Sequence, residues 1–287
     1  MGLRVAGLLN ERYTVFGMVR RPEHGEALRA FGVTPIVADL DVPESLWRIG
    51  RLARDILHLA PPPAQGQEDT RTRHLVAALG RARSLVYVST SGVYGDCQGA
   101  IIDETRPPNP QSERAHRRLD AERTLRAWGL RTRTRVAILR VPGIYASDRL
   151  PRVRLAARDP ALRREEDVYT NHIHADDLAL IVRAALWRAA PQRIYHACDD
   201  SSLLMADYLD LVAERLGYAR PPRIERSALE AGLSALQYSF LRESRRLHNG
   251  RLKAELSVVL RYPRVEDGLA AVRDGAVMAS EPLPRQA

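Results

Sequence analysis

The sequence predicts an α/β fold built on a doubly wound parallel sheet. Short apolar runs, typical of strands, alternate with amphipathic segments over the first two thirds of the chain. Within these runs consecutive residues are apolar, so both faces of each strand are expected to be buried. Helices that connect such strands cover both faces of a parallel sheet, and this arrangement defines the doubly wound class.

Six strands and six helices are expected, and they alternate over the first two thirds of the chain. The expected strands cover residues 14–19, 34–38, 55–60, 84–89, 135–141 and 193–198. The expected helices cover residues 1–10, 23–31, 43–53, 70–82, 112–128 and 205–216. Gly32 suits the end of the second helix, and Pro43 suits the first turn of the third. The loop between residues 92 and 111 is rich in Gly, Pro and Asn.

Composition and charge argue against nucleic-acid and membrane binding. The formal net charge is +9, and all but one of the 44 basic residues are arginine, the exception being Lys253. Such a skew is typical of a GC-rich genome, and the arginines are interleaved with acids rather than gathered beside aromatic residues. No apolar run reaches 18 residues and the N-terminus lacks a secretory signal, so a cytoplasmic protein is expected. Cys97 and Cys198 form no CxxC pair and are expected to be reduced.

The sharpest local signal is the segment Ser89–Gly95, which reads STSGVYG and directly follows an expected strand. In an open α/β sheet, ligands bind beyond the carboxyl ends of the strands. Thr90, Ser91 and Tyr94 are therefore candidate catalytic residues, because hydroxyls at this place can bond a substrate oxygen or a ribose. The alternative is a hydroxyl-rich turn that only caps the strand.

This segment resembles the motif after the fifth strand of the extended short-chain dehydrogenases, the nucleotide-sugar epimerases and dehydratases. Five further segments resemble motifs of that family and occur in the family's order. They are Ala38–Leu40, His58–Ala60, Asp103–Glu104, Leu139–Tyr145 and Asn171–Ala179. The resemblance covers residues 2 to about 215. It implies a Rossmann-type NAD(P)-binding core over residues 1–150. A smaller, mainly helical substrate-binding region would cover 151–287, with residues 168–200 returning to the core.

The resemblance also assigns residues to the cofactor. It implies contacts from Gly2, Asp39, Leu40, Leu59, Ala60, Ser89, Arg118, Pro142, Gly143 and Ile144. Arg20 and Arg21 follow the second strand of the family's pattern, where guanidinium groups suit the 2′-phosphate of NADP. NADP is therefore expected over NAD, the alternative being two surface arginines. A small-molecule substrate is expected, and Thr90 would bond its reacting oxygen. The sequence leaves open whether the protein forms a homodimer.

The catalytic Tyr-x-x-x-Lys pair of the family is missing. Aligning Leu119–Glu122 with the family places Arg114 at the Tyr position and Arg118 at the Lys position. Arginine stays protonated and cannot act as a base, so Tyr94 or a substrate group would have to replace the Tyr. Arg118 can still bond a ribose, whereas Arg114 fits a solvated helix face equally well. Asp120 and Glu122 are interpreted as i,i+4 partners of nearby arginines.

The glycine-rich loop of the family is also incomplete. Gly2 matches the last glycine of that loop, and the preceding strand and two glycines have no counterpart in the sequence. A start codon assigned too late is expected, the alternative being a genuine variant. The strands that begin at Thr14 and Asp55 would then each lack their central neighbour, and NADP would bind weakly.

Two functions remain open at this point. The first is an NAD(P)-dependent oxidoreductase or epimerase that acts on a small, nucleotide-linked substrate. The second is a non-catalytic NADP-binding redox sensor, which the loss of Tyr and Lys favours. His172 and His174 would share one face of a strand, but the family motif accounts for them and no metal is expected.

Overall fold

The computed structural model describes residues 1–10, 12–230 and 241–272. Its core is a four-stranded parallel sheet in the order β11-β6-β4-β3. These strands are β3 (Asp55–His58), β4 (Ser84–Thr90), β6 (Arg135–Val141) and β11 (Arg193–His196). The predicted parallel α/β sheet is thus confirmed, and the predicted strands form at the expected places.

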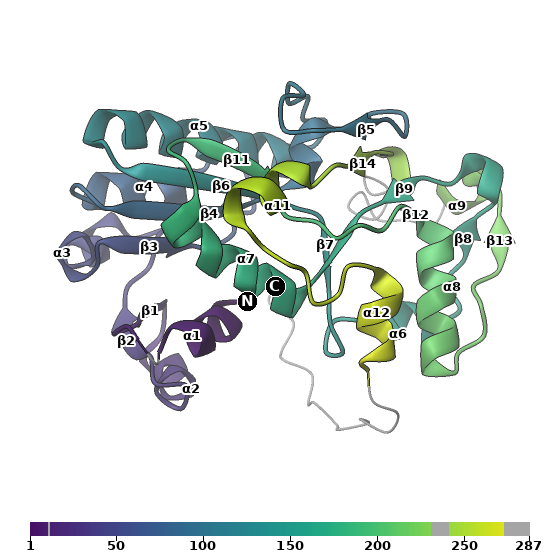
Figure 1. The fold of residues 1–287 in the computed structure, drawn as a ribbon, viewed down its shortest axis with the longest axis horizontal. Helices are drawn as coiled ribbons and strands as arrows, with labels where there is room; N and C mark the ends of the chain where they lie inside the picture. Colours follow the sequence, from purple (N-terminus) through teal and green to yellow (C-terminus); the bar gives the residue numbers. More distant parts are fainter. Residues whose placement is uncertain (11, 231–240, 273–287) are drawn as a thin grey trace.

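Helices cover both faces of this sheet (Figure 1). On one face α4 (Thr70–Ala78) and α5 (Glu113–Thr132) pack against Leu85, Tyr87 and Ile138. On the other face Val86 and Leu139 enter a core shared with α7 (Ala175–Arg188), and α11 (Gly250–Leu256) and α1 (Gly2–Leu9) pack against α7. Neighbouring residues of one strand thus enter opposite cores, which explains why the strands are apolar at consecutive positions.

The first two strands form a pair of their own. β1 (Phe16–Val19) and β2 (Thr34–Val37) are parallel to each other and make no ladder with the four-stranded sheet. Within the described ranges, the second edge of β1 and of β3 has no strand partner. Phe16 and Met18 on β1 are exposed. The connecting elements are η1 (Pro22–His24), α2 (Gly25–Arg29), η2 (Pro43–Leu46) and α3 (Ile49–Leu52).

Several predicted helix boundaries differ from the observed ones. The helix expected at 43–53 is a 3-10 turn followed by the short α3, and α4 ends at Ala78 because Leu79 takes an extended conformation. α5 begins at Glu113, capped by the side chain of Ser112, and continues to Thr132, after which Arg133 adopts a left-handed conformation. α7 was not anticipated as a helix.

The C-terminal region lies at one end of the sheet and combines helices with short strand pairs (Figure 1). Its helical elements are α6 (Arg152–Ala156), η4 (Arg164–Glu166), α8 (Met205–Leu216), α9 (Arg226–Glu230) and α12 (Val265–Ala270). The strand pairs are β7 (Gly143–Tyr145) with β10 (His172–His174), β8 (Ala161–Leu162) with β13 (Arg223–Ile224), β9 (Tyr169–Thr170) with β12 (Leu203–Leu204), and β5 (Ile101–Ile102) with β14 (Arg246–Leu247). Residues 273–287 of the predicted second region lie outside the described residues. No helix in the described part of the chain is long and apolar enough to cross a membrane.

Candidate functional site

The carboxyl ends of three parallel strands bring predicted site residues to one edge of the sheet. His58 is in register with Tyr87, and Thr90 with Val141. Leu59 and Ala60 therefore follow β3 beside the last residues of β4, and the 3-10 turn η3 (Ser91–Tyr94) follows β4. On the other side, Pro142 lies between β6 and β7, and Gly143 and Ile144 belong to β7. This edge is the usual ligand-binding place of an open α/β sheet.

Thr90 ends β4 and shapes the turn that follows. Its Oγ1 accepts a hydrogen bond from the backbone N–H of Gly92 at 3.2 Å, and its side chain is partly exposed. Because this hydroxyl only accepts from the turn, its own proton can still be donated to a ligand oxygen. The side chain of Ser91 is buried, so of the two hydroxyls Thr90 is the more accessible.

Beneath this turn lies a buried charged network. Ser89 Oγ donates to Glu122 Oε1 at 2.6 Å, and Arg140 donates to both oxygens of the same carboxylate, at 3.2 and 2.7 Å. The Arg140 and Glu122 side chains are only 2% and 3% exposed. Interpreting Glu122 as an i,i+4 partner was therefore wrong, because this carboxylate points into the core and joins α5 to β4 and β6.

Asp120 also pairs outside its own helix. Its carboxylate accepts from the Arg73 guanidinium at 2.7 Å and from the backbone N–H of Asp69 at 2.8 Å. The i,i+4 interpretation fails here too, because α4 lies alongside α5 and offers closer donors.

Tyr94 is buried and its hydroxyl is committed to His196. The two atoms are 2.6 Å apart, and the other ring nitrogen of His196 lies 3.1 Å from the carbonyl of His248. A carbonyl can only accept, so Nδ1 carries the proton and Nε2 accepts from the Tyr94 hydroxyl. Burial raises the pKa of Tyr94 to about 12 and lowers the pKa of His196 to about 3. Tyr94 is therefore held as a neutral phenol.

The two arginines at the family's Tyr and Lys positions lie on α5. Arg118 Nη1 donates to the Tyr87 hydroxyl at 3.0 Å and to the Val88 carbonyl at 2.9 Å, which fixes its guanidinium against β4. Arg114 is exposed and lies one turn earlier. Partial desolvation lowers the pKa of Arg114, and the neighbouring Glu243 carboxylate opposes that change.

The residues assigned to the adenosine end of the cofactor follow β1 and β2. Arg20 and Arg21 are exposed directly after β1, and Arg21 lies 4.0 Å from Glu23. After β2, Asp39 Oδ1 accepts from the backbone of Asp41, and Leu40 is buried. At the start of α1 no side chain caps the helix, and a Cβ placed on Gly2 would meet no atom within 4 Å.

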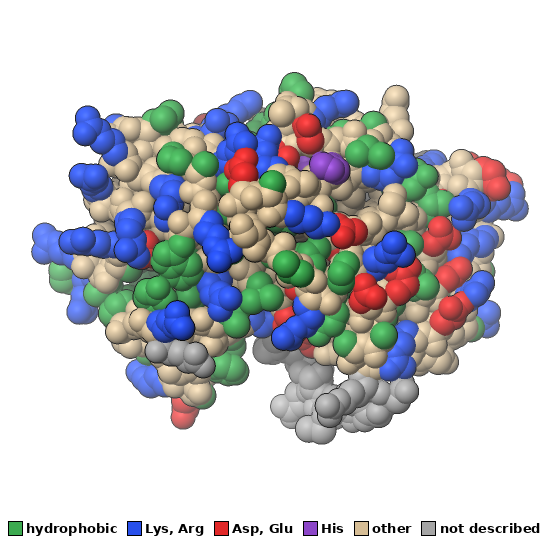
Figure 2. Space-filling view, in the orientation of Figure 1, with side chains coloured by type: hydrophobic (Ala, Val, Ile, Leu, Met, Phe, Trp, Pro, Cys, Tyr) green, Lys and Arg blue, Asp and Glu red, His purple; other side chains and the backbone are tan. Residues whose placement is uncertain are grey.

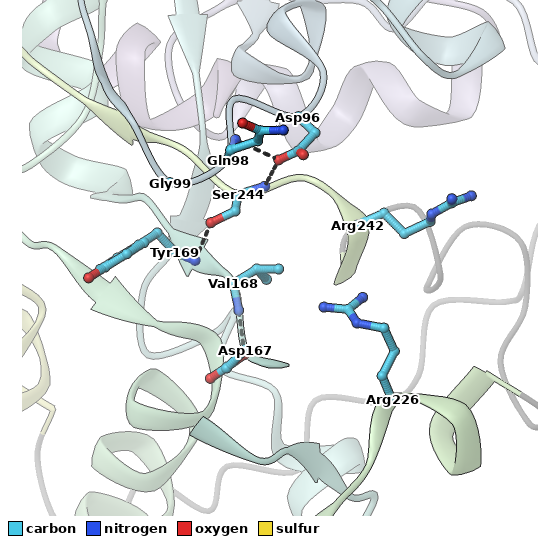
Figure 3. Close-up of a pocket in the computed structure, with 9 residues that line it drawn as sticks. All are labelled: Asp96, Gln98, Gly99, Asp167, Val168, Tyr169, Arg226, Arg242 and Ser244. Atoms are coloured by element: carbon cyan, nitrogen blue, oxygen red, sulfur yellow. Dashed lines mark hydrogen bonds between the residues drawn. The ribbon is translucent and has the colours of Figure 1, made fainter. Parts of the chain in front are cut away.

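A pocket of about 530 Å³ lies between the loop after β4 and the C-terminal region. Figure 3 shows Arg226 and Arg242 beside this hollow, opposite the backbone that carries Tyr169 and Ser244. Its lining is completed by Asp96, Gln98, Gly99, Asp167 and Val168. The sequence interpretation missed these residues, because segments far apart in the chain supply them and no local motif marks them.

Basic side chains are dispersed over the visible surface, and the two histidines of β10 pack against aromatic rings. Figure 2 shows basic side chains spread over the visible face and interspersed with acidic ones. His172 and His174 both lie on β10, as expected, and His172 stacks on Tyr208 with ring centroids 4.0 Å apart. Across the described part of the chain, no group of three His, Cys, Asp or Glu side chains could hold a metal ion.

Known proteins share this architecture and indicate its family. Residues 64–255 match a family model described as the RmlD substrate binding domain. A comparison with the curated proteins found no match. Among solved structures, one similar chain is a conserved protein of unknown function from Silicibacter pomeroyi DSS. It is 27% identical with a TM-score of 0.76, and the match covers 94% of this chain and 93% of that one.

Two more distant structures share the fold. UDP-glucuronic acid 4-epimerase from Bacillus cereus, in complex with NAD, is 16% identical with a TM-score of 0.72, covering 94% of this chain and 92% of that one. RMD from Pseudomonas aeruginosa, complexed with NADPH, is 16% identical with a TM-score of 0.66, covering 91% and 98%.

Proposed function

Since this chain belongs to the family of the RmlD substrate binding domain, and with it to the extended short-chain dehydrogenases and epimerases that its sequence resembles, we propose that it is a nicotinamide-dependent oxidoreductase or epimerase. Its proposed substrate is a small, nucleotide-linked molecule. The observation that carries the proposal is the convergence of Thr90, Arg118 and the Pro142–Ile144 segment at the carboxyl ends of β4 and β6.

The residues at the strand ends fit a dinucleotide. The first turn of α1 offers backbone N–H groups that no side chain caps, with open space at Gly2, and such groups attract phosphate. Arg20 and Arg21 present exposed guanidinium groups, which favour NADP over NAD through its 2′-phosphate. A bound nicotinamide supplies hydride transfer, and the protein supplies position and electrostatics.

Each side chain at the strand ends has a proposed role. Thr90 donates to the reacting oxygen of the substrate, and Arg118, fixed by Tyr87 and Val88, orients the ribose. Tyr94 positions the turn, because its hydroxyl is bonded to His196 and its pKa is raised by burial. Ser89 likewise holds the turn through Glu122.

The pocket beside the loop after β4 is the proposed place of the substrate. Arg226 and Arg242 line it together with the carboxylates of Asp96 and Asp167, and guanidinium groups suit the phosphates of a nucleotide-linked molecule. The UDP-glucuronic acid epimerase of the same fold supports this substrate class by its name.

A second candidate function is a redox sensor that binds NADP without turnover. Arg114 and Arg118 favour it, because neither can supply the base that the family's Tyr provides. The two candidates differ in one measurable property, which is turnover.

The test is a substrate screen with the purified full-length protein. UDP-glucose and UDP-glucuronic acid are incubated with NADP⁺ or NADPH, and products are detected by mass spectrometry and by cofactor absorbance. Product formation that falls about 10²-fold or more in Thr90→Val, but not in the exposed Thr34→Val control, supports the enzyme. Saturable NADPH binding without any product supports the sensor.

A further inference from the structure

We propose that Glu243 is the acid–base residue of this site and replaces the Tyr whose position Arg114 takes. The inference rests on the proposed function, since a proton-transfer residue is needed only if the protein catalyses hydride transfer. No motif of the sequence marks Glu243, which lies more than 120 residues after α5 begins.

Glu243 faces the turn that carries Thr90. A Cβ placed on Gly92 would lie 3.5 Å from Thr90 Oγ1 and 3.9 Å from Glu243 Oε2. The carboxylate and the hydroxyl therefore approach the same point in space. Because Gly92 has no side chain, that point stays open between them.

The position of Glu243 is fixed by the segment that follows it. The Ser244 carbonyl accepts from the backbone N–H groups of Cys97 and Gly99, at 3.0 and 2.9 Å. The Ser244 N–H donates to Asp96 at 2.9 Å, and β14 extends the attachment by pairing with β5. These bonds tie the segment to the loop directly after the turn, so the approach of Glu243 to Thr90 is part of the fold.

Arg245 holds the carboxylate itself. Its Nη1 lies 2.9 Å from Glu243 Oε2 and 2.8 Å from the carbonyl of Gly95, and the Glu243 and Arg245 side chains are each 11% exposed. The oxygen that approaches the turn, Oε2, is thus the one that Arg245 orients. A carboxylate oxygen has two lone pairs, so Oε2 can accept one hydrogen bond from the guanidinium and still accept a proton from a ligand.

The chemistry of the neighbouring side chains leaves this role to Glu243. Arg114 and Arg118 remain protonated and can only donate. The Tyr94 phenol is buried, and its hydroxyl is bonded to His196. A carboxylate, in contrast, can accept a proton from a ligand and return it.

The proposed step conserves atoms and electrons. In the oxidation direction, the O–H bond of a substrate hydroxyl breaks and its proton moves to a Glu243 oxygen. The C–H bond of the carbon that bears this hydroxyl breaks, and the hydrogen leaves with the bonding electron pair, as hydride, for the oxidised nicotinamide. A carbonyl remains, which accepts a hydrogen bond from Thr90. In the reduction direction, Glu243 returns the proton to the carbonyl oxygen as hydride arrives at carbon.

The alternative is that Glu243 serves only to neutralise Arg245. Glu243→Gln separates the two roles, because the amide oxygen can still accept from Arg245 but cannot transfer a proton. Glu225→Gln is the matched control, since Glu225 is an exposed glutamate that pairs with Arg163 away from the turn. Glu243→Asp is the conservative variant.

The first readout is turnover in the screen described above. We expect Glu243→Gln to lose about 10²–10⁴-fold in kcat, the usual range for a general acid or base. Glu243→Asp should retain part of the rate, and Glu225→Gln all of it.

The second readout needs no turnover. A carboxylate at the turn favours the positively charged oxidised nicotinamide over the neutral reduced ring. Calorimetry should therefore show the preference for NADPH over NADP⁺ increasing at least about threefold in Glu243→Gln, with no change in Glu225→Gln.

The possible results separate the inference from the proposed function. Lost turnover together with the altered NADPH preference, at an unchanged melting temperature, supports the acid–base role. Wild-type turnover that Glu243→Gln retains overturns the inference and leaves the proposed function intact. A wild type that binds cofactor but forms no product overturns the acid–base role, and one that binds neither NADP⁺ nor NADPH overturns the proposed function as well.

Discussion

The buried ion pair between Glu122 and Arg140 offers the clearest test of how the site is supported. We predict that Glu122→Gln strongly destabilises the protein. The carboxylate accepts three hydrogen bonds, one from Ser89 and two from Arg140, and both charged side chains are almost fully buried. The amide would leave the Arg140 charge without its counter-charge in a site from which water is excluded.

The expected cost follows from these contacts. Removing one partner of a buried ion pair costs about 3–5 kcal/mol, because the remaining charge is left uncompensated. Glu113→Gln is the matched control on the same helix. Its side chain is 72% exposed and lies 3.5 Å from Arg117, so its loss should cost about 1 kcal/mol or less.

Urea denaturation measures both free energies of unfolding, and the midpoint of Glu122→Gln should be far lower than that of Glu113→Gln. In a double-mutant cycle, Glu122→Leu combined with Arg140→Met should cost less than the sum of the two single changes. Equal midpoints for Glu122→Gln and Glu113→Gln, or strict additivity in the cycle, would refute the reasoning.

Three further predictions concern the cofactor, the reaction and pH. Replacing Arg20 and Arg21 by Ala should cost on the order of 1–3 kcal/mol of NADP binding and leave NAD binding nearly unchanged in calorimetry; equal losses would sink the NADP assignment. Thr90→Val should lower kcat about 10²–10³-fold with little change in the Kd for NADP, and a weakened Kd with unchanged kcat would argue against the proposed role of Thr90. Burial raises the pKa of Asp199 to about 8; its contribution to stability is therefore complete at low pH and is lost as the pH rises from about 4 to about 8. The melting temperature of Asp199→Asn should accordingly rise relative to wild type as the pH is raised through this window, and a constant difference would contradict the prediction.

The core of the fold could be predicted because its signals are local. β4 and β6 are continuous apolar runs, since their residues alternate between two buried faces. α8 was predicted with its observed ends, because Met205–Leu216 has a clear apolar face and Gly217 ends it in a left-handed conformation. α7 was overlooked, because its first residues were interpreted only as part of a motif.

Contacts between distant segments could not be predicted in the same way. β8, β9, β12 and β13 have two residues each, too few to show a strand period. β5 and β14 pair although about half of the chain separates them, and this pairing brings Glu243 to the turn. The same limit applies to Glu122, which in sequence looks like one charge among many on an arginine-rich helix. Its burial depends on Arg140, which belongs to a different element.

The predicted site residues differ in how far the structure brings them together. Thr90, Arg118 and Gly143 come to one edge of the sheet, because parallel strands end there together. Arg20 directly follows β1, which belongs to the separate β1–β2 pair. The position of Arg20 relative to the four-stranded sheet depends on helix packing, because the two sheets share no hydrogen-bonded strand pair. Strand patterns in a sequence do not predict such packing.

The central claim is that this chain binds a nicotinamide dinucleotide at the carboxyl ends of its strands. Calorimetric titration of the purified full-length protein with NADPH tests it most directly, with NADH as the comparison. We predict saturable binding of one NADPH per chain, tighter than that of NADH and weakened by Arg20→Ala. Absence of saturable binding for both dinucleotides up to millimolar concentration would contradict the account.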